Sequence, residues 1–112
     1  MPSYRMHLPI GDMRPGITPA EVMEQAELAL GTLHVVEKRD VEAPLVGGKR
    51  IGRVVLRFAV DSSTWADEDA TARQALRVVI DHLEGTTATI APPFAVLLTR
   101  GMGGRFRPIP PG

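Results

Sequence analysis

The residues best suited to chemistry in this chain are charged side chains that alternate with apolar ones, near residues 4–10 and 50–60. Guanidinium groups pair with carboxylates and phosphates, and a histidine among arginines has a lowered pKa and can serve as a general base. We expect these side chains to share one surface and to contact an anionic group there. The members of this sheet-face set are Arg5, His7, Arg53, Val55 and Arg57.

A second basic cluster lies in residues 100–112, where glycine and proline are frequent and no acidic residue follows Glu84. This composition opposes both a helix and a central strand. We therefore expect a C-terminal arm that becomes ordered on binding, attached to a folded domain of residues 1–99. The candidate binding residues of this arm set are Arg100, Arg105, Phe106 and Arg107.

The residue types also exclude several kinds of site. The chain has no cysteine, which excludes a disulfide scaffold, a cysteine zinc site, an iron–sulfur cluster and a thiol nucleophile. His7, His34 and His82 are far apart in the sequence, and no two of them have the i, i+4 spacing of a helical metal site. We expect neither a metal nor a cofactor, and the chain is more readily explained as a binding protein than as an enzyme.

Two helices are indicated by their start signals and apolar stripes. In the first, over residues 18–31, a threonine, a proline and a glutamate form a capping box with proline at the first helical position. The second, over residues 64–84, carries three acids in its first turn, where they complement the positive end of the helix dipole. Trp65 is expected to be one of its buried residues.

Four strands are indicated by apolar runs and by alternation with a period of two. They are expected at residues 4–10, 32–43, 50–60 and 94–99. With right-handed crossovers, the element order predicts an α+β domain with the ferredoxin-like βαββαβ fold. Its four-stranded antiparallel sheet would have the strand order 4-1-3-2, with two helices on one face. This fold hosts many unrelated functions and therefore indicates none of them.

Acidic and basic residues are expected to lie on opposite sides of this domain. Residues 18–31 and 64–84 carry eight acids and two bases, whereas the rest of the chain carries eleven bases and five acids. The chain as a whole has no net charge. We expect an acidic helix side and a basic open sheet face, which would attract an acidic protein, nucleic acid or an anionic ligand.

The strand over residues 50–60 is similar to one strand of the RNA-recognition motif at Gly52, Leu56 and Phe58. That module stacks bases on aromatic side chains of its central strands. Arg53 and Val55 stand at those positions here, so the resemblance implies phosphate contacts rather than base stacking.

Three functional hypotheses follow. The leading one is a non-catalytic binding or assembly module that uses the sheet face and the arm to self-associate or to dock on a partner protein, for example as a subunit of a virion or a multi-subunit complex. The second is a small-molecule binder or cofactor-free enzyme resembling the dimeric α/β-barrel proteins, with His7, Arg53 and Arg57 lining its cavity. The third is a nucleic-acid-binding domain that contacts phosphates. Without a signal-peptide pattern or an apolar run of membrane-spanning length, we expect a soluble, cytoplasmic protein with no membrane partner.

Overall fold

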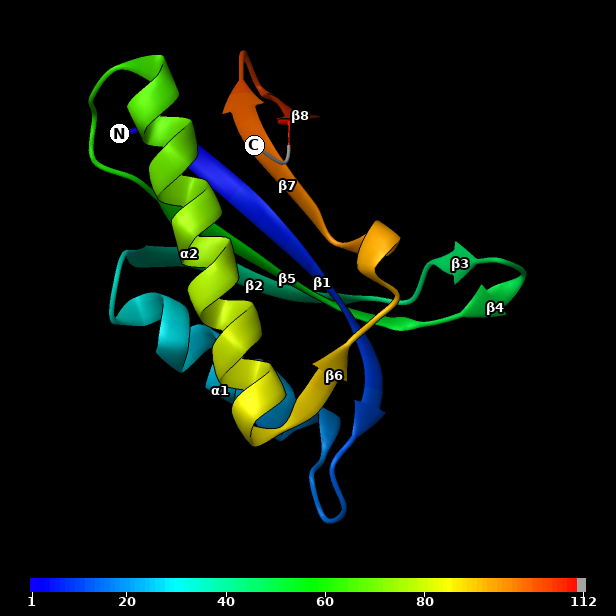
Figure 1. Cartoon of the computed structure of the whole chain (residues 1–112). Coiled ribbons are helices and arrows are strands. Elements are labelled where there is room, and N and C mark those ends of the chain that lie inside the picture. Colours follow the sequence, from blue (N-terminus) through cyan, green and yellow to red (C-terminus); the bar gives the residue numbers. More distant parts are fainter. Residues whose placement is uncertain (111–112) are drawn as a thin grey trace.

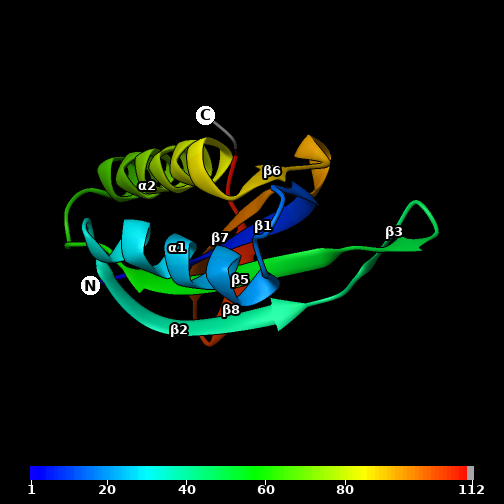
Figure 2. The same ribbon diagram turned by 90° about the horizontal axis from the view of Figure 1, so that it is seen from below.

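The computed structural model describes residues 1–110, in which two helices cover one face of an antiparallel sheet (Figures 1 and 2). The elements in chain order are β1 (Ser3–Met13), α1 (Pro19–Gly31), β2 (Val35–Glu42), β3 (Leu45–Val46), β4 (Lys49–Arg50), β5 (Gly52–Ala59), α2 (Trp65–Thr86), β6 (Ala88–Ile90), the 3-10 turn η1 (Pro93–Ala95), β7 (Leu97–Met102) and β8 (Arg105–Pro108). No helix among the described residues is both long enough and apolar enough to cross a membrane.

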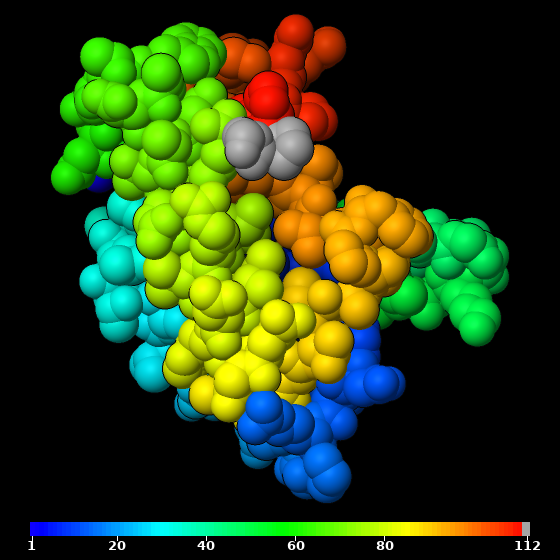
Figure 3. All heavy atoms as spheres, in the orientation of Figure 1, coloured from blue at the N-terminus to red at the C-terminus, as the bar shows by residue number. Residues whose placement is uncertain are grey.

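The sheet is larger than predicted, so the four-stranded ferredoxin-like assignment is wrong, although the α+β class is correct. The main sheet has six strands, in the order β2-β5-β1-β7-β8 with β6 also paired to β1. β3 and β4 form a separate two-stranded hairpin, which protrudes from the body of the molecule (Figure 3). Of the additional strands, β6 lies in a segment for which no element was predicted, and β8 lies in the C-terminal segment whose glycine and proline content opposed regular structure.

The C-terminal segment forms a strand pair where an arm without regular structure was expected. β7 and β8 pair antiparallel, with Met102 opposite Arg105. Gly103 and Gly104 connect them with φ angles of +57° and +82°. A two-residue type I′ hairpin turn requires such left-handed conformations, which glycine adopts without steric cost. Residues 111 and 112 of the expected arm lie outside the described residues.

β6 and β7 lie one after the other along the same edge of β1. β6 pairs with β1 at Ile10, and β7 pairs with it at His7. The proline pair that starts at Pro92 separates the two strands, because proline has no N–H group to donate to the ladder. The strand expected over residues 94–99 therefore begins later, at Leu97.

Both helices begin where the capping signals predicted. The Thr18 hydroxyl accepts a hydrogen bond from the Glu21 N–H at 3.2 Å, and the Glu21 carboxylate accepts one from the Thr18 N–H at 3.4 Å. The Thr64 hydroxyl accepts a hydrogen bond from the Asp67 N–H at 3.2 Å. These caps satisfy N–H groups that the first turn of a helix leaves unpaired.

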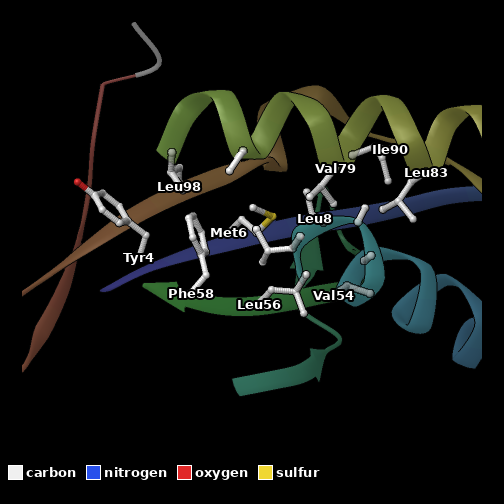
Figure 4. Packing of buried hydrophobic residues seen from close by; sticks show 14 of the residues in the cluster. Tyr4, Met6, Leu8, Val54, Leu56, Phe58, Val79, Leu83, Ile90 and Leu98 are labelled. Carbon is white, nitrogen blue, oxygen red and sulfur yellow. The ribbon is translucent and has the colours of Figure 1, made fainter. Parts of the chain in front are cut away.

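The hydrophobic core lies between the two helices and the central strands β1 and β5 (Figure 4). As the alternation predicted, every second residue of these strands is buried there: Tyr4, Met6, Leu8, Val54, Leu56 and Phe58. Trp65 was expected in this core, and that prediction is wrong, because the side chain is 57% exposed at the start of α2.

Candidate functional site

The sheet-face set lies on the side of the sheet that faces away from the helices. Arg5 is opposite Arg57 and His7 is opposite Val55 across the β1–β5 pair. Arg53 lies two residues before Val55 on β5 and therefore points to the same face as Val55. All five residues are buried or half-buried, because the side chains of neighbouring strands cover them in part.

Acidic residues of β2 neutralise much of this face, which the sequence predicted to be basic. An N–H of Arg53 lies 2.8 Å from the Glu42 carboxylate, and an N–H of Arg57 lies 3.1 Å from that of Glu37. β2 pairs with β5 so that Glu42 lies opposite Arg53, and an irregularity of the ladder between Val36 and Lys38 lets Glu37 reach Arg57. The charge contrast between the helix side and the sheet side is therefore smaller than the residue counts suggest.

His7 lies half-buried among these ion pairs. Burial lowers the pKa of His7 and the positive charge of Arg53 lowers it further, while Glu42, 3.5 Å from Nδ1, opposes both effects. The hollow beside His7 measures only about 110 Å³, below the roughly 300–1,000 Å³ typical of small-molecule sites. This geometry favours a structural position for His7 over a ligand site centred on it.

The β7–β8 hairpin adds an aromatic ring to the same face. The guanidinium carbon of Arg5 lies 3.9 Å from the centre of the Phe106 ring, and that of Arg57 lies 5.3 Å from it. Gly101 makes room for the ring, because a Cβ atom there would lie only 3.3 Å from it and from the carbonyl oxygen of Ser3. Cation–π contacts thus join two residue sets that the sequence analysis treated as separate.

A hollow of about 770 Å³ opens between residues 1–3, the two arginines of the central strands and the β7–β8 hairpin. Arg5, Arg57 and Arg105 line it, and no lining residue carries a carboxylate side chain. Arg57 is engaged by Glu37, whereas neither Arg5 nor Arg105 forms an ion pair within residues 1–110. This arginine hollow therefore presents two guanidinium groups with free donors.

Arg100, expected in the arm set, is buried on the helix side of the sheet. It forms ion pairs with Glu68 at 2.7 Å and with Asp69 at 3.0 Å. It also donates a hydrogen bond to the Tyr4 hydroxyl at 2.6 Å, and that hydroxyl donates one to Asp69 at 2.5 Å. The Trp65 ring centre lies 3.8 Å from its guanidinium carbon. Arg100 thus joins the start of α2 to β1 and β7 and does not belong to the exposed surface.

The fold therefore regroups the candidate residues. Of the arm set, Arg105 and Phe106 lie at the arginine hollow. Arg107 is exposed and stands opposite Arg100 in the register of β7 and β8. Sequence reasoning missed the contribution of Gly101 and the ion pairs made by β2. The Gly-Gly pair between Met102 and Arg105 was the available signal, because such pairs form tight hairpins and a hairpin places Phe106 over β7.

The stability of the chain is expected to fall in acid partly through Glu68. The hydrogen bond donated by the Ser63 N–H lowers the pKa of this carboxyl, and the hydrogen bond from Arg100 lowers it further. A carboxyl whose pKa is lower in the folded chain stabilises it above the pKa of the unfolded chain, and this stabilisation disappears as pH falls through the folded value. Urea midpoints measured from neutral to acidic pH should therefore fall less for Glu68→Gln than for the wild type. Equally steep falls would contradict this assignment.

The fold and the hollow together define an α+β protein with a concave cationic site. In the comparisons with known proteins, no family model and no curated sequence matches this chain. Within residues 1–110, no three His, Cys, Asp or Glu side chains are grouped so as to hold a metal ion. The function is therefore inferred from geometry and charge.

Proposed function

We propose that this chain is a non-catalytic protein-binding module that receives an acidic segment of a partner protein in the arginine hollow. The observation that carries the proposal is that Arg5 and Arg105, from strands far apart in the sequence, line one hollow of about 770 Å³ without a carboxylate in its lining. A guanidinium group binds a carboxylate through two parallel hydrogen bonds, which gives both affinity and orientation.

The rest of the face favours a short acidic segment over a nucleic acid. Asp40 and Glu42 lie beside His7 on the same face, so an extended polyanion would have to pass carboxylates. The Phe106 ring is already covered by Arg5, and it is therefore not open to a stacked base. Compact carboxylate groups held within the hollow avoid both difficulties.

A second copy of the chain has the chemistry of such a partner. Its helices expose five acids and only one base: Glu21, Glu24, Asp67, Asp81 and Glu84 against Arg77. Contact between this surface and the arginine hollow would join copies head to tail and make the chain a subunit of an assembly.

Replacing both Arg5 and Arg105 with alanine is expected to weaken the binding of a labelled oligoglutamate peptide by more than about tenfold. Each charge-assisted hydrogen bond that is lost is worth about 1.5–3 kcal/mol, and tenfold corresponds to about 1.4 kcal/mol. Fluorescence anisotropy at low salt measures the affinity, which should also fall as salt is added.

Arg77→Ala is the matched control, because Arg77 is exposed on α2, away from the hollow. Equal affinity of the peptide for the double variant and the control would contradict the proposal. Tighter binding of a single-stranded oligonucleotide than of the peptide would favour phosphate recognition instead. A wild-type chain that associates at low salt, with a monomeric double variant, would identify the partner as a second copy.

A further inference from the structure

Within residues 1–110, β2 and β8 are the end strands of the main sheet, and each has one edge without a neighbouring strand (Figure 1). Such an edge presents backbone N–H and C=O groups that can pair with a strand of another chain. Four antiparallel steps separate β2 from β8, so the two strands run in the same direction. Because they lie at opposite ends of one sheet, their free edges can meet only between two copies of the chain.

On β8, the backbone groups of Phe106 point to the free edge. The Ile109 N–H donates a hydrogen bond to the Leu98 carbonyl at 3.0 Å. Hydrogen-bonded and non-hydrogen-bonded pairs alternate along an antiparallel ladder, and Phe106, opposite Gly101, lies three positions from this pair. Phe106 therefore belongs to a non-hydrogen-bonded pair, and its N–H and C=O groups face away from β7.

On β2, the same alternation identifies Val41 as a residue whose backbone groups face the free edge. The Ile51 N–H donates a hydrogen bond to the Pro44 carbonyl at 3.1 Å, and Val41, opposite Val54, lies three positions from that pair. The Val41 N–H donates instead to the Asp40 carboxylate at 2.8 Å. A strand that arrives at this edge can take over that N–H and release the carboxylate for another partner.

The residues beside Phe106 and Val41 carry opposite charges, two arginines on β8 and two carboxylates on β2. They are Arg105, Arg107, Asp40 and Glu42. The arginines and Asp40 form no ion pair within residues 1–110. Glu42 makes its contacts in this part of the chain through Oε1, so Oε2 stays available to a second guanidinium group.

The faces of the two strands also match in an antiparallel contact. Because β2 and β8 run in the same direction, the second copy has to be turned over, which exchanges the faces of its sheet. Phe106 lies on the open face beside Arg5, whereas Val41 is 64% exposed on the helix side, opposite Val54. Turning the second copy over brings Phe106 and Val41 to one face, where directly opposite side chains must lie.

We propose that β8 pairs antiparallel with β2 of a second copy, with Phe106 opposite Val41. This register forms two cross-strand ion pairs in non-hydrogen-bonded positions, where side chains lie closest. The pairs are Arg107 with Asp40 and Arg105 with Glu42. The inference rests on the proposed function, because Arg105 lines the arginine hollow, and it identifies the acidic segment as residues 40–42 of a second copy in place of the helix acids.

Identical edges do not fit each other in this register. Pairing of β8 with β8 about Phe106 would place arginines opposite each other, and pairing of β2 with β2 about Val41 would place carboxylates opposite each other. Like charges that are directly opposite destabilise a strand pair. The contact therefore joins unlike edges and leaves one free edge at each end, so assembly continues beyond a dimer.

Sedimentation velocity of the full chain at low salt, over a range of concentrations, tests this inference. The average mass is expected to rise past that of a dimer. Asp40→Arg and Arg107→Asp change exposed residues, and each should raise the concentration needed for association by more than about tenfold, because like charges then lie opposite each other. An equimolar mixture of the two variants should associate again, since every contact between unlike variants pairs an arginine with an aspartate.

Asp81→Arg makes the same change of charge at an exposed position of α2 and should associate like the wild type. A wild-type chain that stays monomeric, an Arg107→Asp variant that associates like the wild type, or a mixture that does not associate would overturn the inference. Asp40 does not line the arginine hollow, so dilute Asp40→Arg should bind oligoglutamate like the wild type. Peptide binding by a monomeric wild type would therefore overturn this inference alone, whereas charge-swapped association without peptide binding would contradict only the proposed function.

Discussion

Replacing Arg100 with alanine is expected to lower the free energy of unfolding by about 3–5 kcal/mol. The guanidinium group is buried and bound to Glu68, Asp69 and the Tyr4 hydroxyl. Without it, two neighbouring carboxylates remain beneath the sheet without a cation, and a buried charge without a partner is costly. Urea denaturation at neutral pH, followed by Trp65 fluorescence, measures the loss.

Arg105→Ala is the control for this experiment, because Arg105 is exposed on the adjacent strand and should change stability by less than about 0.5 kcal/mol. A second variant combines Arg100→Met with Glu68→Gln and Asp69→Asn. It should recover much of the loss, because no buried charge is then left without a partner. An Arg100→Ala variant as stable as the control would show that the ion pairs are not buried in solution.

Replacing Phe58 with alanine is expected to lower the free energy of unfolding by a similar amount, about 3–5 kcal/mol. Its ring is fully buried and lies between the rings of Tyr4, at 5.9 Å, and His34, at 5.7 Å. Truncation removes apolar burial and leaves a cavity that the surrounding rings fill only in part. The same urea denaturation experiment measures this effect.

Phe94→Ala makes the same change of side chain at a position that is 80% exposed on η1. We expect a change of less than about 0.5 kcal/mol there. Similar losses for the two phenylalanine variants would mean that the side of β5 assigned to the core is wrong.

The parts of the fold that the sequence predicted well are those set by local signals. Thr18 and Glu21 form the capping box that their spacing indicates. The alternation in β1 and β5 placed Leu56 and Phe58 in the core and Arg57 on the opposite face, because a strand has a period of two. Such signals depend only on residues close in the sequence, so tertiary contacts do not change what they predict.

The extent of the sheet was not predictable from composition alone. Glycine and proline counts opposed a strand in the C-terminal segment, yet Gly103 and Gly104 are there because the turn between β7 and β8 needs left-handed residues. The pairing of β8 is a tertiary feature, and it alone brings Phe106 onto Arg5.

The position of Arg100 could have been deduced in part. Leu98 and Arg100 are alternate residues of β7 and therefore share a face. An arginine on the core face requires an acidic partner, and α2 carries Glu68 and Asp69 in its first turns. The helix dipole alone accounts for acids in the first turns of a helix. The sequence therefore offered no reason to expect that Glu68 and Asp69 bind Arg100.

Arg100 and Gly101 are consecutive residues of β7 and point to opposite sides of the sheet. The first is fastened to α2 by two ion pairs, and the second lies beneath the Phe106 ring. β7 is thus contacted on both faces beside the arginine hollow, and for the proposed binding of an acidic segment these contacts would preorganise the cationic surface. Association there should cost the chain little conformational entropy, so that even a small contact area can sustain useful affinity.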